Sequence, residues 1–143
     1  MSSTIISRTV FVKAAPGTIF ELLADPRRHG EIDGSGTVQN ARLNAPARLS
    51  LGATFGMDMK LGVPYRITNT VVEFEENKRI AWRHFGGHVW RYILEPVDGG
   101  TQVTEQFDPT TAKIPLVLTL MKASKNNAIA IEKTLDNLQD LFD

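Results

Sequence analysis

The sequence contains no cysteine, no excess of charge of either sign and no long apolar run. Without cysteine there is no disulfide, no thiolate metal site, no iron–sulfur cluster and no cysteine nucleophile. Sixteen basic and sixteen acidic side chains give a formal net charge of zero. A protein built mainly to bind nucleic acid needs a basic surplus, so we expect no nucleic-acid partner.

The longest apolar-rich stretch, residues 114–121, contains a proline and a threonine and is too short to cross a bilayer. Residues 1–8 lack the basic and apolar pattern of a secretory signal. We therefore expect a cytoplasmic protein without stable membrane insertion. The 143 residues suit one domain, over residues 1–143, whose hydrophobic core is large enough to be stable without disulfides or a bound metal.

The hydrophobic pattern changes period along the chain. After a β-rich start, Pro16 favours a helix with a buried apolar stripe, and Asp25 and Pro26 can open a second short helix. Glycines then indicate a flexible loop over 30–36. The alternating segments predict strands at 4–12, 38–43, 49–60, 65–75, 80–85, 88–95 and 101–108. Spacings of three, four and seven predict one long amphipathic helix over 115–141.

This order predicts an α+β fold, a helix-grip arrangement in which a curved antiparallel sheet of about seven strands wraps around a long C-terminal helix. One sheet face must be apolar, and only the long helix can cover it. A ligand would lie between them. The large side chains expected to line that space are Met57, Met59, Val72, Phe74, Trp82, Trp90, Tyr92, Phe107, Leu118 and Met121. The same residues are also those of an ordinary core.

Several stretches resemble one known superfamily, and together they cover nearly the whole chain. They are residues 15–26, 71–74, 78–82, 90–96 and 99–104. The sequence is similar to the START and polyketide cyclase/dehydrase superfamily, also called SRPBCC, which has the helix-grip fold. The resemblance implies a hydrophobic pocket for a small apolar or aromatic molecule and implies no particular reaction. Where members often carry a tryptophan, this sequence has His29.

The densest polar cluster contains His29, Glu31 and Asp33. His29 could pair with a carboxylate and act as a general acid–base at the pocket mouth. The alternative is a solvated loop with helix-capping groups. The three side chains lie within five positions and match no metal-ligand spacing, so we predict no metal site and no cofactor.

Two further residues are candidates for acid–base chemistry. His84 could be a polar group in the pocket or part of a surface turn with His88. Glu105 alternates with Val103 and Phe107, so it could face inward and have a raised pKa. A bulge or the other register would instead place it in a surface ion pair. Arg66, Arg83 and Arg91 are candidate partners.

Three functions remain open from the sequence. The first is binding of a small hydrophobic ligand of lipid, polyketide or aromatic type, as carrier or sensor. The second is a polyketide cyclase/dehydratase-type enzyme that uses His, Glu or Tyr groups of the pocket. The third is a regulatory protein-interaction module, and a homodimer is compatible with the sequence. Two or more convergent ionisable groups with perturbed pKa values would favour the enzyme.

Overall fold

The computed structural model describes residues 5–34, 38–41, 46–61, 63–84, 87–110 and 117–143. Side chains are described for 5–34, 46–57, 68–83, 87–110 and 127–143. The sheet has seven antiparallel strands in the order β1-β7-β6-β5-β4-β3-β2. They are β1 Ile6–Val12, β2 Val38–Ala41, β3 Thr54–Leu61, β4 Val63–Glu75, β5 Arg79–His84, β6 Val89–Val97 and β7 Gly100–Asp108.

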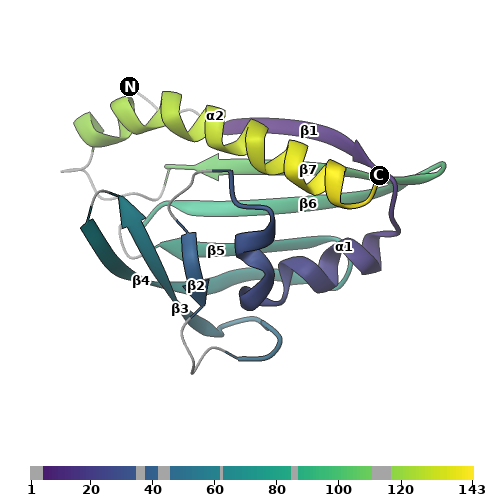
Figure 1. Ribbon diagram of the computed structural model, residues 1–143, viewed down its shortest axis with the longest axis horizontal. Coiled ribbons are helices and arrows are strands. Elements are labelled where there is room, and N and C mark those ends of the chain that lie inside the picture. The colour runs from purple at the N-terminus through teal and green to yellow at the C-terminus, as the bar shows by residue number, and fades with distance from the viewer. Residues whose placement is uncertain (1–4, 35–37, 42–45, 62, 85–86, 111–116) are drawn as a thin grey trace.

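Within the described ranges, three helices accompany the sheet: α1 Pro16–Leu23, η1 Pro26–Glu31 and α2 Val117–Leu141. Pro16 opens α1, and the Asp25 carboxylate accepts a hydrogen bond from the Arg27 amide at 3.0 Å to cap η1, a 3₁₀ helix. Figure 1 shows α1 and α2 on the same face of the curved sheet, with α2 running along β1 and β7. The predicted fold class is therefore confirmed.

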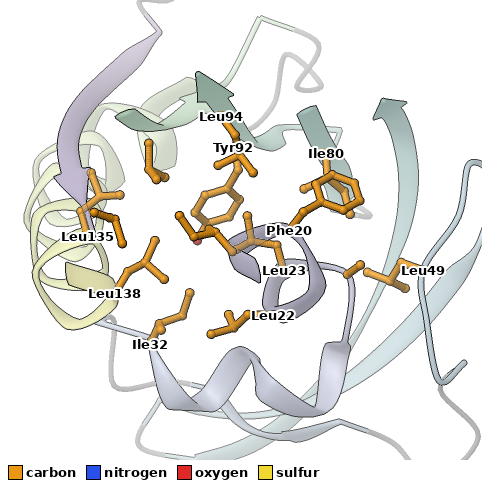
Figure 2. Packing of buried hydrophobic residues seen from close by; sticks show 14 of the residues in the cluster. Phe20, Leu22, Leu23, Ile32, Leu49, Ile80, Tyr92, Leu94, Leu135 and Leu138 are labelled. Carbon is orange, nitrogen blue, oxygen red and sulfur yellow. The ribbon is translucent and has the colours of Figure 1, made fainter. Parts of the chain in front are cut away.

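The core lies between that face and the helices. Figure 2 shows Phe20, Leu22 and Leu23 of α1 converging with Leu135 and Leu138 of α2. All five side chains are fully buried. At roughly 2 kcal/mol for each fully buried large apolar side chain, such contacts fix the two helices on the sheet. We call the sheet face that carries this core the inner face.

Tight turns determine the register of two hairpins. Asn77, with φ of 62°, adopts the left-handed conformation in the turn between β4 and β5. Gly99, with φ of 81°, does the same between β6 and β7. Asparagine and glycine are the residues that accept this conformation most readily. Both turns fall between segments that the sequence predicts as strands.

Two predicted segments differ from the structure. Strand β3 begins at Thr54 rather than at residue 49, because Leu49 is buried in the core and its amide bonds to the Ala24 carbonyl at 2.7 Å. The expected flexible loop includes Gly34, which packs against α2. A Cβ added to Gly34 would lie 2.5 Å from the Thr134 nitrogen and 2.7 Å from the Ala130 oxygen. Gly34 is therefore required for a close approach between backbones.

Candidate functional site

Aromatic side chains form a continuous wall across the inner face. Trp82 of β5 lies opposite Trp90 of β6. The ring of Trp82 is 5.8 Å from Tyr92 and 5.6 Å from Phe55, and the ring of Trp90 is 4.9 Å from Phe107. Both tryptophans keep part of their surface exposed. The sheet therefore presents a wide aromatic surface on its central strands.

His29 joins this wall from η1. Its ring stacks on Trp82, with centroids 4.9 Å apart and planes 19° apart, and meets Phe55 edge-on. Its Nε2 lies 2.8 Å from the Leu23 carbonyl oxygen, and the N–H of a neutral imidazole donates a hydrogen bond to that oxygen. Burial lowers the pKa of His29, so the ring is neutral near pH 7. The hydrogen-bond partner is a main-chain carbonyl, not the carboxylate suggested by the sequence.

Glu105 and Tyr92 form a polar pair inside the apolar face. They lie directly opposite each other on β7 and β6, and their exposed fractions are 4% and 5%. The neighbouring pairs are Leu94 with Val103 and Trp90 with Phe107, all apolar. Oε1 of Glu105 is buried and has no hydrogen-bond partner among the residues that the structure describes. Glu105 thus takes the inward position, one of the two alternatives predicted from alternation.

The surroundings keep this carboxyl protonated at neutral pH. Burial raises the pKa of Glu105 to about 8, with a further contribution from the negative charge of Asp33 and an opposing one from the Tyr92 hydrogen bond. Burial and the nearby Glu105 likewise raise the pKa of Tyr92 well above its usual value. Both groups are therefore neutral hydrogen-bonding groups near pH 7.

Asp33 is held beside this pair by contacts with α2. The Gly34 amide donates to the Thr134 hydroxyl at 2.8 Å, and the Asn137 amide donates to the Ile32 carbonyl at 3.2 Å. Together with the close packing of Gly34 these bonds fasten the segment after η1 to the helix. The predicted loop cluster is consequently divided: His29 packs on the aromatic wall and Asp33 is half-buried, whereas Glu31 is exposed and pairs with Arg28 at 3.1 Å.

Of the three arginines predicted as partners of Glu105, the two whose side chains are described do not pair with it. Arg91 lies on the outer face, where it binds Glu73 at 2.7 Å and Asp108 at 3.3 Å. The hydrogen bonds of Arg91 are the largest cause of the lowered pKa of Glu73. Arg83 is exposed. Arg66 lies where side chains are not described, and the described groups that affect the pKa of Glu105 are Tyr92 and Asp33.

A β-bulge changes one predicted wall residue. The ladder between β4 and β5 shifts between Val71 and Glu73, so Val71 is opposite Trp82 and is 1% exposed. Val72 is the extra residue; it is half-buried and lies outside the core cluster. The expectation of Val72 as a wall residue rests on strict alternation, which the bulge interrupts at this point.

The other predicted wall residues divide into two sets. Met57 is buried in the core cluster. Phe74 packs against the same cluster, with its ring centroid 5.3 Å from that of Phe20. The side chains of Met59, His84, Leu118 and Met121 lie outside the described residues. Asn69 is a polar residue of the inner face that was not predicted; it is 4% exposed and opposite Phe55. Its place two residues before a buried valine was the only sequence signal.

Among the described residues, no three His, Asp or Glu side chains gather as metal ligands. No described helix is both long and apolar enough to span a membrane.

Several solved structures share the fold of this chain. Protein CV1439 from Chromobacterium violaceum superposes with a TM-score of 0.75 at 15% identity, covering 98% of each chain. The AHSA1-like protein from Aeromonas hydrophila gives a TM-score of 0.67 at 19% identity, covering 96% of this chain and 90% of its own. At these identities the likeness shows the fold alone, which is the helix-grip fold.

Sequence comparison gives the family. Residues 3–143 match the model of the polyketide cyclase/dehydrase and lipid transport family, so the chain belongs to that family. It is 43% identical over 143 residues to the uncharacterised protein Rv0088 of Mycobacterium tuberculosis. That match covers 96% of this chain and 63% of the relative, so the chain spans less than two thirds of that relative's length. The predicted resemblance is confirmed.

Proposed function

We propose that this protein binds a small, largely apolar ligand against the aromatic wall of the inner face, as a carrier or sensor. The observation that carries the proposal is that Trp82 and Trp90, on central strands of that face, are only partly buried. Large aromatic side chains in such positions are ordinarily covered, and covering the rest of their apolar surface is worth about 25 cal/mol for each Å² removed from water. Membership of a family that includes lipid transport supports the same role.

A fluorescent dye tests this proposal. N-phenylnaphthylamine is neutral and becomes strongly fluorescent in apolar sites, and it accepts excitation energy from tryptophan. Because the two tryptophans of the chain both lie on the inner face, bound dye should quench their emission saturably. Trp90→Ala should weaken dye binding about tenfold, whereas Leu51→Ala, at a surface position 65% exposed, should leave it unchanged. Equal affinities for Trp90→Ala and the parent protein would overturn the proposal.

A second candidate function, an enzyme of the cyclase/dehydratase type, is favoured by Glu105. A buried carboxyl with a pKa of about 8 can take and return a proton near neutral pH. Such a group could remove a proton from the carbon next to a ligand carbonyl. The test is exchange of the methyl protons of acetylnaphthalene in deuterated water, followed by NMR. If the protein is such an enzyme, it should accelerate this exchange, and the exchange rate should rise with pH through about 8. The variant Glu105→Gln should give no acceleration.

A further inference from the structure

We propose that Glu105 and Tyr92 form the polar anchor of the ligand site and select ligands that carry a neutral carbonyl oxygen over ligands that carry a carboxylate. The inference rests on the proposed ligand-binding function and specifies the chemistry of the ligand. It concerns recognition and holds whether or not the protein is an enzyme.

The position of the pair singles it out on the inner face. Tyr92 and Glu105 stand between two apolar cross-strand pairs and are almost fully buried. The unpaired Oε1 of Glu105 favours binding of a polar partner, because a buried polar atom without a hydrogen bond is destabilising. The Trp90–Phe107 pair is the next inner-face pair on the same two strands, so this oxygen lies beside the aromatic wall.

The charges around Glu105 favour its neutral form. Asp33, after η1, adds a negative charge, and Tyr92, on β6, supplies a hydroxyl. Arg8 is directly opposite on β1, but it is half-exposed and binds Glu132 of α2 at 3.4 Å. Desolvation by the core is the largest influence. A neutral carboxyl has one O–H, and with Tyr92 on one oxygen, the other is free to offer that O–H to a ligand.

This geometry discriminates between ligands by charge. A ketone or ester oxygen accepts the O–H of Glu105 and satisfies the buried pair. A ligand carboxylate would bring a negative charge into an apolar region that already contains Asp33, at a cost that binding must overcome. A pure hydrocarbon leaves the pair unsatisfied. The expected order of affinity is therefore carbonyl compound, then hydrocarbon, then carboxylate.

Three shape-matched probes test the anchor: acetylnaphthalene, ethylnaphthalene and naphthoate, each measured by displacement of N-phenylnaphthylamine. At pH 6 acetylnaphthalene should bind about tenfold more tightly than ethylnaphthalene, which corresponds to one hydrogen bond, and naphthoate should bind most weakly. Above pH 8 the ketone advantage should disappear, because the ionised carboxyl can only accept hydrogen bonds.

Two neutral variants make the test specific. Glu105→Gln keeps an N–H donor, so it should retain the ketone preference and lose its pH dependence. Glu105→Leu has no donor and should bind the ketone and the hydrocarbon equally. Equal affinities at pH 6 in the parent protein, or a ketone preference that survives in Glu105→Leu, would overturn the anchor. Failure of the dye itself to bind would instead overturn the proposed ligand-binding function.

Discussion

Glu105→Gln is expected to stabilise the protein increasingly as pH rises. The folded protein holds the proton of Glu105 up to about pH 8, whereas the unfolded chain releases it near 4.5. Between these values the folded state binds more protons, so the free energy of unfolding falls as pH rises, by about 1.4 kcal/mol for each pH unit. Over this window the loss sums to about 5 kcal/mol, a large part of the stability of an ordinary domain. Glutamine has no such ionisation.

The assay is urea unfolding of both proteins, followed by circular dichroism from pH 5 to pH 9. The two should be nearly equal in stability at pH 5, and the variant should be more stable by several kcal/mol at pH 9. The difference in unfolding free energy between the two proteins removes the contribution of His29, which is the same in both. The lowered pKa of His29 makes the protein less stable as pH falls below 6.5, the opposite direction to the effect of Glu105. Glu95→Gln, at an exposed position on β6, is the matched control and should show no such trend. Parallel curves for Glu105→Gln and the parent protein would refute a buried, protonated Glu105.

Two further predictions concern the elements around the site. Gly34→Ala should lower the free energy of unfolding by about 1–3 kcal/mol, because the added Cβ would collide with the α2 backbone. Gly17→Ala is the control and should cause no such loss, since the nearest atom to its Cβ is 3.6 Å away. Equal thermal midpoints for the two variants would count against the close packing of Gly34. Arg91→Met should cost about 2–3 kcal/mol at pH 7 by removing the cation that Glu73 and Asp108 share, although Glu73 keeps Arg79 at 3.3 Å. Since the pKa values of Glu73 and Asp108 are lowered in the folded protein, the Arg91 penalty should shrink as acid protonates them; a penalty unchanged at pH 3 would contradict the ion-pair account.

The sequence predicted the architecture well because its local signals agree. Pro16 begins α1, Asp25 and Pro26 begin η1, and Gly99 turns β6 into β7. Each of these residues has a backbone preference that acts over a few positions. The inward position of Glu105 also came from short-range alternation, although the sequence could not choose between the two faces.

The site depends on long-range register, which alternation alone does not determine. A bulge interrupts the alternation between Val71 and Glu73, and Arg91 faces outward to Glu73 instead of toward Glu105. The approach of Asp33 to Glu105 requires contacts between the segment after η1 and α2, about one hundred residues later in the chain. Cross-strand pairing and helix docking therefore decide the chemistry that local patterns only suggest.

The central claim is that an apolar ligand lies against Trp82 and Trp90 on the inner face. The most direct measurement is an NMR titration of the two tryptophan indole N–H signals with acetylnaphthalene. We expect both signals to shift saturably, with the same dissociation constant as displacement of N-phenylnaphthylamine. Binding of the ketone that leaves both indole signals in place would contradict the claim, because the ligand would then lie away from the aromatic wall.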